Sequence, residues 1–185
     1  VFEHVKGKVI MEYIKGESLE DYISSNSFKI DEYILIIAQL CLALKIAQDK
    51  YGFVHWNLNP SNIMLQRFSS PKSFDYAVSL DKIYRVNTTV IPVIINYGKA
   101  HVVHNNIHHG FINPYKFSSI QDITKILLTS VNQIVINQRL EKTDFTKLIT
   151  ISNFISGTTY RKEEFHSAKD LLQFTSSVKK STMCD

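Results

Sequence analysis

The chain has 185 residues, of which 44% are hydrophobic and 21% are charged, and its formal net charge is +4. This length and composition favour one compact domain and exclude a disordered chain or two ordinary domains. The positive charge is mild and forms no lysine- or arginine-rich block, so we expect no nucleic-acid partner. The two cysteines, Cys41 and Cys184, suggest neither a disulfide framework nor a zinc site, which favours a reducing, cytoplasmic compartment.

The most apolar stretch covers residues 33–47, but Gln39 and Lys45 interrupt it. It is too short and too polar to cross a bilayer, so it predicts a buried core helix and no membrane partner. The chain starts at Val1 without a Met, and its first residues already resemble the interior of a folded unit. We therefore expect a fragment of a longer protein.

A strand and two helices are expected in the first part of the chain. Residues 8–14 are apolar and β-prone, and Gly16 in the next dipeptide breaks the strand. Ser18 is a good N-cap for a short helix over 19–24.

A long helix should follow over 32–49, with Asp31 as its N-cap and Gly52 at its end. Its apolar residues surround most of the helix, which predicts burial in the middle of the domain.

The middle of the chain alternates loops with short strands. A polar loop is expected over 56–62 and a strand over 63–65. Residues 66–89 lack strong periodicity and contain a turn signal at 69–71, so we interpret them as an insertion. Residues 90–95 predict a strand, and Pro92 within it indicates a sheet edge or a strand start.

Helices dominate the rest of the sequence. A break at 96–98 precedes an irregular, histidine-rich stretch at 99–117. Helical patterns follow at 118–132, 144–154 and 167–176. We expect a mostly α-helical α+β domain over 1–176, with the insertion at about 66–89, and a tail over 177–185.

Three segments, taken in order, resemble the protein-kinase signature set. They are VIMEYIKGESL at 9–19, VHWNLNPSNIML at 54–65 and VIINYG at 93–98. They are similar to the hinge strand, to the catalytic loop H-R-D-L-x-x-x-N with its following strand, and to the strand that ends in D-F-G. SIQDI at 119–123 resembles the start of a buried kinase helix whose Asp, here Asp122, holds the catalytic loop. HSAKDLL at 166–172 resembles the last helix of the domain.

The resemblance implies a protein-kinase-like C-terminal lobe that lacks most of the N-terminal lobe, because no Gly-rich loop, strand Lys or partner Glu helix is present. IPVII at 91–95 and HHG at 108–110 are similar to kinase-like proteins of large DNA viruses. The resemblance therefore also implies a viral protein in the host-cell cytoplasm.

The catalytic positions that the resemblance implies are occupied by asparagine. Asn57 stands at the catalytic Asp position, Asn59 at the Lys position of serine/threonine kinases, and Asn96 at the D-F-G Asp position, while Asn62 keeps the family's Asn. An amide has no useful basicity, and Mg²⁺ prefers charged oxygen ligands. We expect Asn62 and Asn96 to bind Mg²⁺ weakly at best. These asparagines fit a pseudokinase or a deliberate inactivation, and they also fit ordinary loop residues with hydrogen-bonding roles.

Adenine recognition is also carried over from the resemblance. The Glu12 carbonyl and the Ile14 amide would face the adenine edge, Met11 would be the gatekeeper, and Met64 would form the apolar floor. The two methionines fit an ordinary core equally well. We expect ATP to bind weakly and with little Mg²⁺ dependence.

The four histidines His101, His104, His108 and His109 raise the question of a metal site. No Cys or acidic partner lies near them in sequence and their spacing fits no firm ligand pattern, so we expect no structural metal.

Four functions remain open. The first is a catalytically impaired kinase-like module that binds a protein partner or a nucleotide, with a loss of about a thousand-fold in rate. The second is an active serine/threonine kinase that transfers the ATP γ-phosphate to protein. The third is a small-molecule phosphotransferase, which Pro60-Ser61 and 97–99 disfavour, and the fourth is a purely structural helical domain.

Overall fold

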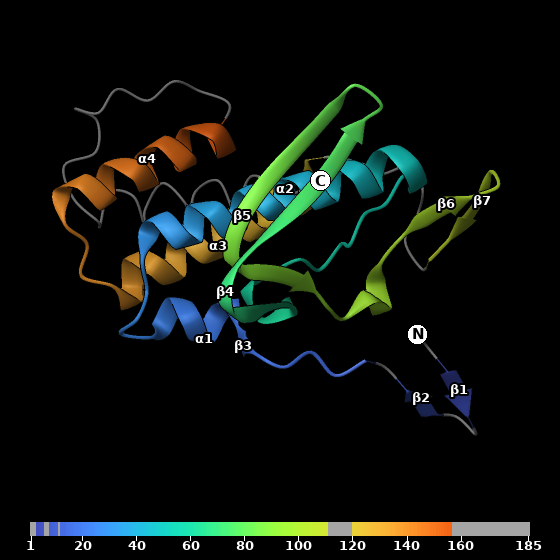
Figure 1. The fold of residues 1–185 in the computed structure, drawn as a ribbon, viewed down its shortest axis with the longest axis horizontal. Helices are drawn as coiled ribbons and strands as arrows, with labels where there is room; N and C mark the ends of the chain where they lie inside the picture. Colours follow the sequence, from blue (N-terminus) through green and yellow to red (C-terminus); the bar gives the residue numbers. More distant parts are fainter. Residues whose placement is uncertain (1–2, 6–7, 11, 111–119, 157–185) are drawn as a thin grey trace.

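The computed structural model describes residues 3–5, 8–10, 12–110 and 120–156, which form an α+β fold (Figure 1). The strands are β1 (Glu3–Val5), β2 (Lys8–Ile10), β3 (Glu17–Ser18), β4 (Ile63–Ser79), β5 (Lys82–Ile94), β6 (Val102–His104) and β7 (Ile107–His109). The helices are α1 (Leu19–Ser24), α2 (Ile30–Tyr51), α3 (Gln121–Asn137) and α4 (Lys142–Ser156), with short 3-10 helices at Pro60–Asn62 and Tyr97–Lys99.

The strands form three small antiparallel sheets. β1 pairs with β2, β6 pairs with β7, and the remaining sheet has the order β3-β4-β5. The strand expected over 8–14 is wrong in its extent, because β2, in which Ile10 pairs with Glu3 of β1, does not continue through 12–14. Residues 12–15 adopt no regular structure, and Met11 lies outside the described residues.

The helix α1 starts as its sequence predicts. The Ser18 hydroxyl accepts the Asp21 backbone N–H at 3.0 Å, and the Asp21 carboxylate accepts the Ser18 backbone N–H at 3.3 Å. This reciprocal pair is a capping box, which satisfies two N–H groups that a helix start leaves without partners.

The helix α2 is longer than predicted, and its predicted N-cap is wrong. Lys29 occupies the N-cap position without a side-chain bond, and the Asp31 carboxylate instead accepts a hydrogen bond from Lys147 of α4 at 2.6 Å. The predicted end is confirmed, because Gly52 adopts the left-handed conformation with φ 52°. Glycine is favoured there because it has no Cβ.

Residues 66–89, interpreted from the sequence as an insertion, form most of a β-hairpin rather than an irregular loop. β4 and β5 pair from Ile63 and Ile94 to a two-residue reversal at Leu80-Asp81, and the hairpin crosses α2 (Figure 1). The turn expected at 69–71 is wrong, since these residues lie where the register shifts between Arg67 and Lys72. Pro71 fits such a bulge because it has no N–H to donate to the ladder.

Two other strand predictions can be judged from the same topology. Pro92 lies in β5, which is the outer strand of the β3-β4-β5 sheet, so the edge position is confirmed. The stretch expected to be irregular at 99–117 contains the β6–β7 hairpin over its first part.

The core lies between the helices and the inner end of the sheet. α2 lies beside α3, and the Tyr33 hydroxyl contacts the Ser130 hydroxyl at 2.6 Å with both side chains buried. The helix expected over 118–132 runs instead to Asn137, because Val131 and Ile134 continue the buried face. The Gln138 amide then donates to the Ile23 carbonyl of α1 at 2.6 Å.

The last helices are only partly described. α4 is two residues longer at each end than the predicted 144–154. The helix expected at 167–176 and the tail at 177–185 lie outside the described residues. Within the described part of the chain, no helix combines the length and apolarity that a membrane crossing requires.

Candidate functional site

Asp122 at the start of α3 holds the loop that resembles a catalytic loop. Its fully buried carboxylate accepts the backbone N–H of His55 at 2.6 Å and that of Trp56 at 3.0 Å. The structural role expected for Asp122 is therefore confirmed. Burial raises the pKa of this carboxyl, while the two N–H donors, His55 and Lys125 act in the opposite direction.

The same anchor fixes an uncommon backbone conformation. Trp56 has φ 62°, a left-handed value that few residues other than glycine adopt. Such conformations persist where the surrounding structure holds them, and they concentrate at functional sites. The two hydrogen bonds to Asp122 restrain the backbone at Trp56 and at the residue before it.

His55 joins the loop to the strand that ends at Asn96. It is fully buried, its Nδ1 accepts the Asn57 backbone N–H at 3.3 Å, and its Nε2 contacts the Ile95 carbonyl at 2.9 Å. Because Nδ1 accepts, Nε2 carries the proton and donates to the carbonyl. Burial lowers the pKa of His55, which agrees with this neutral form.

Hydrogen bonds link Asn96 to Asn62 and Asn62 to the backbone of Asn57. The Asn62 Nδ2 donates to the Asn57 backbone carbonyl at 2.8 Å, and the Asn96 Nδ2 donates to the Asn62 Oδ1 at 3.1 Å. The Lys125 ammonium donates to the Asn57 Oδ1 at 3.1 Å. A carbonyl can only accept and an ammonium can only donate, so these partners determine the orientation of all three amides.

This orientation bears directly on the predicted metal ligands. Asn62 and Asn96 do come together, but the Asn62 oxygen already accepts an N–H from Asn96. A hard cation requires oxygen ligands, and here a donor group faces the oxygen that would bind it. The residues present therefore do not fit a Mg²⁺ ion without a rearrangement of the Asn96 side chain.

Asn59, at the position of the kinase Lys, plays a local part in the structure. Its Oδ1 accepts the Ser61 hydroxyl at 2.6 Å, and its backbone caps the 3-10 helix Pro60–Asn62. The cation that contacts the loop is instead Lys125 of α3, which also donates to the Trp56 carbonyl at 3.3 Å.

The role of Lys125 was not predicted from the sequence, although its spacing from Asp122 indicates it. It follows Asp122 by three residues, and residues three apart in a helix lie on the same face. A helix whose Asp122 holds the loop backbone must therefore point Lys125 toward that loop as well.

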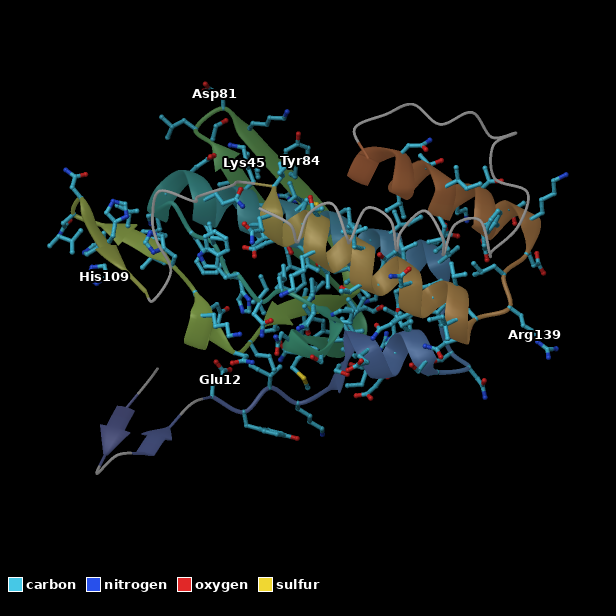
Figure 2. The ribbon with its side chains drawn as sticks, turned by 180° about the vertical axis from the view of Figure 1, so that it is seen from behind. Glu12, Lys45, Asp81, Tyr84, His109 and Arg139 are labelled. Atoms are coloured by element: carbon cyan, nitrogen blue, oxygen red, sulfur yellow. The ribbon has the colours of Figure 1, made fainter. Side chains whose placement is uncertain are left out.

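The predicted adenine-contacting residues are only partly located. Glu12 and Ile14 lie on the extended segment that leads into β3, with Glu12 exposed (Figure 2). Met64 is half-buried in β4, where it pairs with Ser18 on one side and Val93 on the other.

The histidine cluster resolves into one pair and two exposed residues. The His101 Nε2 contacts the His108 Nδ1 at 3.1 Å, and His101 is buried, while His104 and His109 are exposed (Figure 2). Among the residues that the structure describes, no group of three or more His, Cys, Asp or Glu side chains is placed to hold a metal ion. The His101 backbone also exchanges two hydrogen bonds with Val54, at 2.9 and 2.7 Å, next to the catalytic-like loop.

Comparison with known proteins identifies relatives in iridoviruses. The chain is 32% identical over 168 residues to "Uncharacterized protein 179R" of Invertebrate iridescent virus 6, a match that covers 78% of this chain and 14% of the relative. It is 28% identical over 161 residues to "Uncharacterized protein 035R" of Invertebrate iridescent virus 3, covering 80% of this chain and 14% of the relative.

The chain thus spans about a seventh of the length of the curated relatives that it matches. No protein-family model matches it. These relatives support a viral origin for the chain.

Proposed function

We propose that the chain is the C-terminal lobe of a protein-kinase-like domain that has lost most of its phosphoryl-transfer activity and acts by binding a protein partner or, weakly, a nucleotide. The observation that carries this proposal is the clamp of Asp122 on the backbone of His55 and Trp56. Asp122 lies on the buried helix α3, and the resemblance implies the same place for the Asp that holds a kinase catalytic loop.

Two further contacts support the same reading. The His55 ring reaches the Ile95 carbonyl, immediately before the D-F-G-like segment, and Asn62 reaches back to Asn57. In a kinase, the corresponding loop and segment must lie together so that both can act on one phosphate. The tertiary contacts bring together the sequence segments that the resemblance pairs.

The proposed loss of activity follows from charge. A kinase uses a catalytic-loop Asp to accept the proton of the substrate hydroxyl and a D-F-G Asp to bind metal. Asn57 has no basicity and its Oδ1 already accepts from Lys125, while Asn96 offers an N–H to its neighbour. Loss of one such electrostatic contact costs about 3–4 kcal/mol, and the losses need not add.

Nucleotide binding belongs to the proposal in a restricted form. Glu12 and Ile14 would contact the adenine through backbone groups, with Met11 as the gatekeeper and Met64 as the apolar floor. Since the amides do not fit Mg²⁺, ATP should bind weakly and with little dependence on Mg²⁺.

A paired assay on the natural full-length protein tests the loss of activity. The protein and its Asn57→Asp, Asn96→Asp double variant would be compared for γ-phosphate transfer from ATP to generic protein substrates. We expect transfer only with the double variant. A matched control, Asn26→Asp with Asn87→Asp, adds the same charge at exposed positions and should remain inactive.

Each alternative has a distinct outcome. Equal transfer to protein by the natural protein and the double variant would show an active serine/threonine kinase and reject the proposal. Transfer to small alcohols or aminoglycosides but not to protein would instead indicate a small-molecule phosphotransferase.

A further inference from the structure

Lys125 is the unexpected charge at the candidate site. Its ammonium contacts the Asn57 side chain and the Trp56 carbonyl from α3, whereas the loop position of the kinase Lys holds the neutral Asn59. A positive charge is therefore present at the loop, but it arrives from the helix beneath it.

This contact decides which end of the Asn57 amide is available. Because the Oδ1 accepts from Lys125, the Nδ2 group lies at the other end of the amide. Within the described part of the chain the Nδ2 donates to no protein acceptor, and it is absent from the buried polar atoms that lack a partner. It is therefore a donor without an acceptor among the described residues, at the position that resembles the one where a kinase presents a carboxylate.

The neighbouring amides of Asn62 and Asn96 also disfavour a metal ion at the site. Asn96 donates an N–H to the Asn62 oxygen, so that oxygen is not free to hold a metal cation that would balance the charge of a phosphate. N–H donors and an ammonium group are the usual partners of phosphate oxygens. The nearest carboxylate, Asp122, is buried beneath the loop, where it interacts with Lys125 and accepts two backbone N–H groups, so the amide positions themselves carry no negative charge.

We infer that Lys125 is a positioning residue that holds the Asn57 amide with its N–H₂ group outward, so that the site recognises a phosphate group without a metal ion. This inference rests on the proposed function and specifies its ligand: a phosphate group of a metal-free nucleotide. The ammonium also adds its charge behind the amide, which strengthens the attraction for an anion.

Binding measurements on the natural full-length protein test this role. The titrants are ATP in EDTA, ATP with Mg²⁺, inorganic triphosphate in EDTA, and adenosine. We expect the protein to bind metal-free ATP at least as tightly as Mg²⁺-ATP. Lys125→Met should weaken binding of metal-free ATP and triphosphate by about tenfold and leave adenosine unchanged.

Three other variants separate positioning from folding. Lys125→Arg keeps the charge and the donors and should restore binding. Asn57→Asp replaces the outward donor by an acceptor and should weaken metal-free ATP by about tenfold. Lys45→Met removes an equivalent charge from the outside of α2, where Lys45 pairs with Asp49 of its own helix, and should change nothing (Figure 2).

The inference about Lys125 and the proposed function would be contradicted by different results. If Lys125→Met binds metal-free ATP as the natural protein does, or if the natural protein binds ATP only with Mg²⁺ or not at all, the inference is overturned. The proposed loss of phosphoryl transfer is judged by its own assay and survives these results. Conversely, phosphoryl transfer by the natural protein would contradict the proposed function, whatever the effect of Lys125→Met on ATP binding.

Discussion

The Asp122 carboxylate accepts the backbone N–H of His55 at 2.6 Å, a contact that spans 67 residues of sequence. It joins the buried helix α3 to the loop that carries Asn57 and Asn62. The link restrains the loop, which has little regular structure of its own.

Removal of this anchor should destabilise the domain. Asp122→Ala leaves two buried N–H groups without their acceptor, and each unsatisfied group costs about 1–3 kcal/mol. We expect a loss of about 2–4 kcal/mol in the free energy of unfolding, measured by urea denaturation. Asp21→Ala, which removes an exposed capping box, should cost about 1 kcal/mol. Equal losses in the two variants would contradict the anchoring role of Asp122.

The buried contact between Tyr33 and Ser130 should show energetic coupling. The two hydroxyls lie 2.6 Å apart between α2 and α3, and burial raises the pKa of Tyr33. A double-mutant cycle of Tyr33→Phe and Ser130→Ala should give a coupling energy of about 1 kcal/mol. A coupling indistinguishable from zero in thermal or urea unfolding would mean that the hydroxyls do not stabilise helix packing.

The stability of the β6–β7 region should decrease in mild acid. His101 is buried, and burial together with His108 and His109 lowers its pKa below the usual value of 6.5. The unfolded chain therefore binds more protons than the fold once the pH drops through about 6.5. The stabilisation is complete above that pH and is lost as the pH falls toward the lowered pKa.

Thermal unfolding of the protein between pH 8 and pH 5 measures this effect. His101→Gln should flatten the decrease in melting temperature on the acid side, with the remaining slope due to other groups such as His55, whose pKa burial also lowers. His104→Gln, at an exposed position, is the matched control and should leave the slope unchanged. If the two variants had identical pH profiles, His101 would not be the titrating group.

Substitution of two glycines by alanine should have different effects on the stability of the fold. A Cβ at Gly16 would overlap the Leu65 carbonyl oxygen of β4, whereas a Cβ at Gly98 would meet only the Asn96 Oδ1, at 3.9 Å. Gly16→Ala must push β3 away from β4, so we expect a loss of about 1–3 kcal/mol, and Gly98→Ala should be nearly neutral. Urea denaturation of both variants checks this, and an unaffected Gly16→Ala would show that β3 is not held against β4.

Local chemistry made several elements predictable. Ser18 with Asp21, Gly52 and the apolar face of α2 act within a few residues, so their helices could be placed before any fold was known. The kinase-like spacing likewise singled out Asn57, Asn62 and Asn96, which the fold brings together. Asp31 failed as an N-cap because α2 begins at Ile30, which places Asp31 inside the first turn, where its carboxylate accepts from Lys147.

The strand pairings could not be predicted in the same way. Residues 66–89 show no clear alternation because their hairpin is largely exposed and contains a bulge, so neither face needs to be uniformly apolar. The β6–β7 hairpin is too short and polar for a periodic signal, and its contact with Val54 depends on chain segments far apart in sequence.

By itself, the sequence determined which residues occupy the candidate site: three neutral amides and no carboxylate at the positions that resemble the catalytic ones of a kinase. Only the tertiary structure decided how those amides are oriented. An amide has a donor end and an acceptor end that the sequence does not distinguish, and the choice depends on Lys125 and on backbone groups that folding brings within hydrogen-bond distance.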